Sequence, residues 1–225
     1  MNHVQIVLFP AFDPLDVIAP FEVLAAACDE AQSDTMIELV CEGEPRSFVG
    51  GTRGLALTAT ATLDPTKPGY VIVPGVSGPV DGDPDAGDET IPVLLARVAA
   101  SNLMPLIRQS LDNPDIVVAT QCGGGLILGM AGLLDGRTAV THTLGNDVLE
   151  ATGVTVVRAR VVDDGDLVSS GGVTSGLDLG LHLAGREFGP NVAYSVERLF
   201  EYERRGTAWH TERSSTTTIG PHREA

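Results

Sequence analysis

The most constraining feature of this sequence is the stretch from Asp115 to Leu128, in which an apolar, β-branched run stops at one cysteine. Glycines follow Cys122 directly and lead into a second apolar segment. This order is typical of a nucleophile elbow, a sharp strand-to-helix turn that presents a side chain at the carboxyl end of a sheet. The alternative interpretation is a small cysteine buried in the core between a strand and a helix.

An elbow would give Cys122 a distinct chemical environment. A helix beginning near Gly123 and Gly124 has unpaired N–H groups and the positive end of its dipole at that point, and both favour a negative charge and lower a thiol pKa. The same N–H groups could bind an oxyanion. We therefore interpret Cys122 as a candidate nucleophile.

The rest of the chain alternates between strand-like runs and helical patterns. Asp13 and Pro14 form an N-cap and first-turn pair, so a helix is expected to follow them. The helical stretch 91–111 is interrupted near Ser101 and Asn102, which predicts two helices. Further strands are expected at 4–9, 36–41, 55–60, 70–74, 138–140, 154–157 and 159–162. Further helices are expected at 126–134 and 191–202, with one that begins near residue 146 and another that ends near residue 187. This alternation predicts an α/β fold with a mostly parallel sheet covered on both faces.

Length and composition fit one domain. The chain has 225 residues, of which 43% are hydrophobic, and this is enough for one well-buried α/β domain. We place that domain at 1–203. The segment 204–225, which opens with Arg-Arg-Gly-Thr-Ala-Trp-His and continues with serines and threonines, is expected to be a poorly ordered C-terminal tail.

Charge and cysteine content exclude several classes of function. Asp and Glu number 30 against 14 Lys and Arg, a net charge of −16, whereas a nucleic-acid partner requires a basic surface. No apolar stretch approaches the ~20 residues of a membrane span and no signal peptide is evident, so we expect a cytoplasmic protein without a membrane partner. Three widely spaced cysteines fit neither a disulfide framework nor a zinc ribbon, and no metal or organic cofactor is expected.

Residues 77–90 are rich in acidic and turn-forming residues. Asp81, Asp83 and Asp85 superficially resemble a calcium-binding loop, but Pro84 intervenes and Pro92 stands where a bidentate glutamate belongs. We therefore interpret this segment as a solvated acidic surface loop.

With these elements placed, the chain resembles the ThiJ/PfpI superfamily, relatives of class I glutamine amidotransferases, from Val4 to about Tyr202. The segments that carry the resemblance lie in the same order as in that family. They are Leu15-Asp16-Val17-Ile18-Ala19-Pro20-Phe21-Glu22-Val23-Leu24, Val73-Pro74-Gly75, the Cys122 elbow, Thr141-His142-Thr143, and Gly171-Gly172-Val173-Thr174-Ser175-Gly176-Leu177-Asp178. The first and last of these, with Ala131-Gly132-Leu133-Leu134-Asp135-Gly136, look most like isonitrile hydratases. The resemblance implies a flavodoxin-like three-layer α/β/α sandwich, usually a homodimer, with Cys122 as the nucleophile.

The resemblance also changes the interpretation of Asp16. From the pattern alone, Asp16 is a carboxylate on the solvent face of a helix. Aligned with the family, it falls where a carboxyl group reaches the cysteine. A carboxyl group in an apolar pocket beside an anion has a raised pKa, which suits a general acid.

Two further residues have alternative interpretations. His142 aligns with a family histidine near the cysteine, although a lone histidine is more often structural. Thr174 either lines the pocket or caps the helix that follows it.

The chain departs from the family beside the nucleophile. Isonitrile hydratases have a threonine directly after the cysteine and amidase-like members have a histidine, but this chain has Gly123. The N–H of Gly123 still allows an oxyanion hole, with the N–H of Gly75 or Val76 as the second donor. Val76 replaces the second glycine of the family's usual Pro-Gly-Gly.

The sequence leaves three hypotheses for function on a small-molecule substrate or ligand. In the first, Cys122 attacks an isonitrile and Asp16 transfers the protons, giving an N-substituted formamide without a cofactor. In the second, Cys122 adds to methylglyoxal, and His142 with Asp16 moves the proton that yields lactate. In the third, the protein is a redox or ligand sensor whose Cys122 oxidises to a sulfinate.

Overall fold

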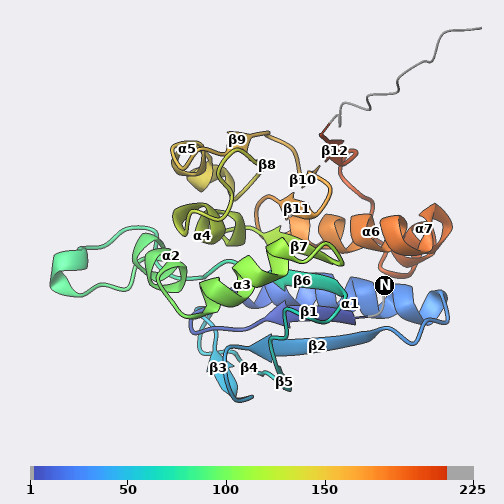
Figure 1. Cartoon of the computed structure of the whole chain (residues 1–225), viewed down its shortest axis with the longest axis horizontal. Helices are drawn as coiled ribbons and strands as arrows, with labels where there is room; N and C mark the ends of the chain where they lie inside the picture. The colour runs from blue at the N-terminus through green and yellow to red at the C-terminus, as the bar shows by residue number, and fades with distance from the viewer. Residues whose placement is uncertain (1–2, 212–225) are drawn as a thin grey trace, which may run out of the picture.

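The computed structural model describes residues 3–211, which form a central sheet between two groups of helices (Figure 1). In this part of the chain the sheet has eight strands in the order β12, β10, β11, β7, β6, β1, β2, β5. Their bounds are β1 His3–Val7, β2 Met36–Cys41, β5 Ala61–Thr62, β6 Gly69–Val73, β7 Ile116–Gln121, β10 Val161–Asp163, β11 Leu167–Ser170 and β12 Trp209–His210. Neighbouring strands are parallel except β10 and β11. The predicted α/β/α sandwich with a mostly parallel sheet is confirmed.

The helices make their contacts within two separate groups. One group is α1 (Pro14–Glu30), α6 (Ser175–Phe188) and α7 (Pro190–Leu199). The other is α2 (Ile91–Ala99), α3 (Leu103–Asp112), α4 (Gly124–Met130) and α5 (Asn146–Glu150). Between them, β1, β6 and β7 are buried along almost their whole length, as apolar strands covered on both faces must be.

Short elements lie outside the central sheet. The strand predicted at 55–60 is β4 (Ala56–Thr58), which pairs antiparallel with β3 (Ser47–Val49). The strands β8 (Thr138–Ala139) and β9 (Thr155–Val156) form a second small sheet. Single 3-10 turns, η1 (Pro84–Ala86) and η2 (Thr143–Gly145), lie in the acidic loop and after β8.

Helix α1 begins as its sequence predicts. The carboxylate of Asp13 accepts a hydrogen bond from the N–H of Leu15 at 2.9 Å, and Pro14 occupies the first turn. The helix then continues through Pro20 to Glu30. This start places Asp16 in the first turn of the helix, on the face that packs toward the sheet.

The interrupted stretch 91–111 forms two helices. α2 ends at Ala99 and α3 begins at Leu103, with a bend of 65° between them. Within residues 3–211, no single helix has the length and apolar character to cross a membrane, although this bent pair together meets the test of length and composition.

The C-terminal segment differs from the prediction over its first part. Residues Trp209 and His210 form β12, an edge strand that pairs with β10, and Arg204 binds Glu197 at 2.7 Å. The predicted tail 204–225 is therefore folded against the sheet up to 211. The rest of it lies outside the described residues.

Candidate active site

Cys122 lies at the turn between β7 and α4, as the elbow pattern predicts. Its φ is +52°, a left-handed conformation that is uncommon for a residue with a side chain. The N–H of Cys122 donates to the carbonyls of Ser170 and Gly171, both at 3.1 Å, and Thr141 donates to its carbonyl at 2.6 Å. These contacts hold the backbone in this conformation. The first residue of α4 must be glycine, because a Cβ on Gly124 would lie 2.2 Å from the carbonyl oxygen of Val73.

Asp16 is completely buried and contacts the thiol. Its Oδ2 accepts from the N–H of Gly75 at 2.9 Å, its Oδ1 accepts from Nε2 of Gln121 at 3.4 Å, and the carboxyl group is hydrogen-bonded to Cys122. Burial, and then the like charge of Asp13, raise the pKa of Asp16 to about 7 against the lowering effect of these donors. The solvent-facing interpretation is therefore wrong, and the structure places Asp16 beside Cys122.

The pKa of the thiol differs from the sequence-based expectation. Burial and the negative charge of Asp16 raise the pKa of Cys122, although the N–H of Gly123 opposes them. The predicted lowering by the helix N-terminus is outweighed because Cys122 is only 6% exposed and α4 has only seven residues. Cys122 and Asp16 therefore compete for a proton as a coupled pair.

A cavity of about 450 Å³ opens above Cys122. Gly123, Val76 and His142 line it, together with Thr141 and Ser77. Most of the remaining wall is apolar and consists of Val80, Ile91, Pro92, Leu95, Leu126, Met130, Leu144, Val148 and Val173. Nδ1 of His142 accepts from the N–H of Leu144 at 3.2 Å, which leaves Nε2 as the nitrogen that carries the hydrogen in the neutral ring.

The structure separates the two candidates for the second oxyanion donor. The N–H of Gly75 donates to Asp16, so the prediction that it serves an oxyanion is contradicted. The N–H of Val76 has no acceptor among residues 3–211, and Val76 lines the cavity. The N–H of Gly123 already faces the sulfur of Cys122. Gly123 and Val76 therefore form the pair of donors that is available at the nucleophile.

Thr174 has neither of its expected roles. It is exposed, it does not line the cavity, and its hydroxyl accepts from Arg160 at 3.2 Å instead of capping α6. The preceding residue, Val173, lines the cavity in its place. Gln121 was also missed, because only the fold shows that the residue before the nucleophile contacts Asp16.

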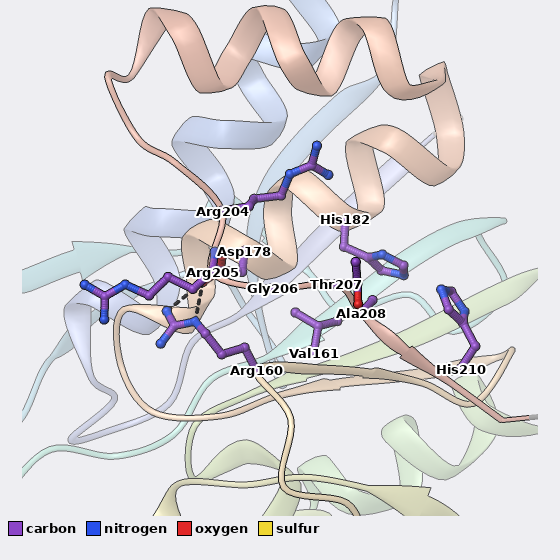
Figure 2. Close-up of a pocket in the computed structure, with 10 residues that line it drawn as sticks. All are labelled: Arg160, Val161, Asp178, His182, Arg204, Arg205, Gly206, Thr207, Ala208 and His210. Carbon is purple, nitrogen blue, oxygen red and sulfur yellow. Dashed lines mark hydrogen bonds and ion pairs between the residues drawn. The ribbon is translucent and has the colours of Figure 1, made fainter.

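A second cavity of about 550 Å³ lies between α6 and the C-terminal segment, and its wall is charged (Figure 2). Arg160 contacts Asp178 there at 2.6 Å, and His182 and His210 face each other with ring centroids 5.6 Å apart. Asp163 accepts from His182 at 2.8 Å. Within the described part of the chain, no group of three or more His, Cys, Asp or Glu side chains is arranged to hold a metal ion.

The chain is similar in sequence to proteins of the DJ-1/PfpI family. A model of the DJ-1/PfpI family matches residues 95–185. The isonitrile hydratase of Pseudomonas putida is 32% identical over 203 residues, which cover 89% of this chain and 78% of that protein. The HTH-type transcriptional regulator CdhR of Pseudomonas aeruginosa is 26% identical over 196 residues, which cover 86% of this chain and 53% of the regulator, so the chain spans about half of it.

Solved structures show the same fold. A ThiJ/PfpI family protein from Pseudomonas syringae superposes with a TM-score of 0.70 at 23% identity, covering 91% of this chain and 76% of that one. DJ-1beta from Drosophila melanogaster superposes with a TM-score of 0.72 at 16% identity, covering 90% and 99%.

Proposed function

The chain belongs to the DJ-1/PfpI family, and from that premise we propose that it is an isonitrile hydratase that needs no cofactor and uses Cys122 as its nucleophile. The observation that carries the proposal is the buried Asp16 carboxyl group, which is hydrogen-bonded to Cys122, a residue that lines a mostly apolar cavity. The similarity to the isonitrile hydratase of Pseudomonas putida supports the choice of substrate.

The first half of the reaction forms a covalent intermediate. The sulfur of Cys122 bonds to the terminal carbon of the isonitrile while the thiol proton passes to Asp16, and Asp16 then gives that proton to the same carbon. The product is a thioimidate, in which this carbon carries one hydrogen, the sulfur and a double bond to nitrogen. A carboxyl group with a pKa of about 7 suits this exchange because it can both accept and release a proton near neutral pH.

The second half consumes one water molecule. Asp16 takes one proton from the water as its oxygen bonds to the thioimidate carbon, and passes this proton to the nitrogen. The carbon–sulfur bond then breaks, the remaining hydroxyl proton of the adduct returns to the sulfur of Cys122, and the N-substituted formamide leaves. The N–H groups of Gly123 and Val76 stabilise the negative charge that develops on the oxygen. Overall, one isonitrile and one water give one formamide.

The cavity supports a substrate without charge and with an apolar substituent on nitrogen. Its wall above the sulfur is formed largely by Leu, Ile, Val, Met and Pro side chains, and a volume of about 450 Å³ accommodates a small molecule. An isonitrile presents a compact polar group to Cys122 and leaves its substituent to this wall.

The test is a turnover assay of the wild-type protein and Cys122→Ala with an alkyl and an aryl isonitrile. We expect the wild type to form the formamide, with one oxygen from ¹⁸O-labelled water, and Cys122→Ala to form none above background. Cys28→Ala and Cys41→Ala are matched controls, because both residues are free buried cysteines that do not line the cavity. Formamide production that survives in Cys122→Ala would contradict the proposal.

One observation favours a second candidate reaction. His142 lines the same cavity as Cys122, so a thiol adduct of methylglyoxal would have a second proton-transfer group within the site. If lactate forms from methylglyoxal and His142→Ala abolishes it, the glyoxalase-type reaction replaces hydration. A folded protein that converts neither substrate, and whose Cys122 is oxidised to a sulfinate by dilute peroxide, would favour the sensor hypothesis.

A further inference from the structure

Gln121 is the residue directly before the nucleophile, and its side chain is completely buried beside Asp16. We propose that Gln121 is a positioning residue that holds the ionised Asp16 carboxylate against Cys122 and ties it to the cavity wall at Val173. This inference rests on the proposed roles of Cys122 and Asp16. In this role Gln121 determines whether Asp16 or Cys122 keeps the proton for which they compete.

The contacts of the Gln121 amide fix its orientation. Nε2 lies 2.9 Å from the carbonyl oxygen of Val173, and because a carbonyl can only accept, this atom must be the NH₂ nitrogen. Its second hydrogen is directed to Oδ1 of Asp16 at 3.4 Å. The opposite end, Oε1, accepts from the hydroxyl of Ser170. One amide therefore links the acid on α1, the loop before α6 and the end of β11.

Helices α1 and α6 pack closely around Gln121. A Cβ on Gly176 would lie 3.5 Å from Cδ of Gln121 and 3.1 Å from Cβ of Ala19, so the glycine lets α1 and α6 close around the amide. Ser170 is also completely buried, and its single hydroxyl hydrogen is shared between Oε1 of Gln121 and the carbonyl oxygen of Thr120, which lies 3.1 Å from the hydroxyl. Without water to replace a lost partner, each of these hydrogen bonds constrains the position of the next.

Gln121 is one of three neutral donors that stabilise the charge on Asp16. The others are the N–H of Gly75, on the second carboxylate oxygen, and the thiol of Cys122. The titratable groups that act on Asp16 are Asp13 and Cys122, and neither supplies a positive charge.

The charged residues of α6, which packs against α1, face elsewhere. Asp178 pairs with Arg160, and His182 and Arg186 contact Asp163. Removing the donor at Gln121 therefore removes a large share of what keeps Asp16 ionised at neutral pH.

The test is the rate at which iodoacetamide alkylates Cys122 between pH 5 and 9, read by peptide mass spectrometry in the full-length protein. In the wild type we expect the alkylation rate to rise with pH until the pair of Asp16 and Cys122 has lost its first proton. The rate should then level off, because the ionised Asp16 raises the pKa of the thiol. Gln121→Met has a similar volume and no donor. Because Asp16 would then keep its own proton to higher pH, the rate should level off about one pH unit later and up to about tenfold higher. Below the midpoint the two profiles should coincide.

Ser170→Ala is the matched control, because it removes the partner of Oε1 and leaves both N–H donations from Gln121 in place. Its midpoint should lie within about 0.3 units of the wild type, since one pH unit corresponds to the loss of a whole charge-assisted hydrogen bond. If Gln121→Met does not fold, Gln121→Glu replaces it and should move the midpoint upward as well, because a second carboxyl group then faces Asp16.

An unchanged midpoint in the folded Gln121 variant, or a profile scaled by one factor at every pH, would overturn the inference and leave Gln121 as a packing residue. The assay contains no isonitrile. A shifted midpoint without hydratase activity would therefore reject the proposed reaction alone, and hydratase activity without a shift would reject the role of Gln121 alone.

Discussion

The cavity at Cys122 and the charged cavity beside α6 are similar in size and opposite in chemistry. The one at Cys122 has a mostly apolar wall, and within residues 3–211 the donors to the adjacent buried carboxyl group of Asp16 are all neutral. The one between α6 and the C-terminal segment is charged, and the carboxylate that lines it, Asp178, pairs with the guanidinium of Arg160 (Figure 2). A buried aspartate is present at both places. The residues around each aspartate determine whether it exchanges protons or remains a structural anion.

A similar contrast separates Asp16 from Asp163, a buried carboxylate that contacts His182 of the charged cavity but does not line it. Burial and the charge of Asp13 raise the pKa of Asp16 to about 7. Burial would also raise the pKa of Asp163, but the hydrogen bonds from His182 and from the N–H of Gly165, with the charge of Arg186, lower it to about 2. Asp163 thus stays ionised at any physiological pH, whereas Asp16 changes its charge near neutrality.

The largest expected effect comes from Asp16→Asn. In the unfolded chain Asp16 ionises near pH 4, but in the folded protein it ionises near pH 7, so the wild type loses stability as the pH rises between these values. Asp16→Asn lacks this loss and should exceed the wild type in free energy of unfolding by up to about 4 kcal/mol at pH 8, and by little at pH 4. Hydration should fall by at least about 100-fold, as for a lost general acid.

Urea unfolding at pH 4 and pH 8, with the turnover assay, measures both effects. Asp29→Asn is the control, because Asp29 is an exposed carboxylate on the same helix. An Asp16→Asn variant that is less stable than the wild type at pH 8 would show that the carboxylate is structural, and the contrast between the two cavities would disappear.

The second effect tests the charged cavity. Asp178 accepts hydrogen bonds from Arg160 at 2.7 Å, from the hydroxyl of Tyr202 at 2.8 Å and from the N–H of Arg205 at 3.0 Å. Asp178→Ala removes the acceptor that these three donors share and should lower the free energy of unfolding by about 3 kcal/mol. The pH midpoint for alkylation of Cys122 should not move. A shifted midpoint would show that the two cavities are coupled.

A smaller loss of stability is expected from Asp163→Asn. Because the folded pKa of Asp163 lies below its unfolded value, its contribution is fully present above about pH 4 and is lost as the pH falls towards 2. The variant should therefore be about 2 kcal/mol less stable at pH 7, and the difference should shrink at pH 3. A difference that stays constant between pH 7 and pH 3 would show that the charge of Asp163 is not its cause.

The sequence predicted the features that depend on neighbouring residues. The elbow at Cys122, the cap of α1 at Asp13 and the break between α2 and α3 each follow from a local pattern of glycine, proline or apolar spacing. The burial of Asp16 required the resemblance to a family, because nothing in its own segment shows which face of the helix meets the sheet.

Features that join distant segments could not be predicted. β12 pairs with β10 across more than 40 residues, and the charged cavity brings Arg160 and His182 to the same place as His210. The raised pKa of the thiol has the same origin, because it depends on how completely Cys122 is buried and on the charge of Asp16. Such effects follow from the assembled fold and leave no local signal.

The smallest expected effect concerns the rim of the apolar cavity. Leu144 lines the cavity and is 71% exposed, so Leu144→Ala should hardly change stability but should remove apolar contact with a bulky substituent. We expect KM for an aryl isonitrile to rise about fivefold with kcat unchanged, equivalent to about 1 kcal/mol of binding, and KM for methyl isonitrile to stay the same. Leu199→Ala is the matched control, because Leu199 is equally exposed at 71% but lies outside the cavity. Two results would contradict this prediction: an equal change of KM in both variants, or a lower kcat of Leu144→Ala for both substrates. In either case the rim does not select the substituent, and the apolar wall serves only to exclude water from Cys122.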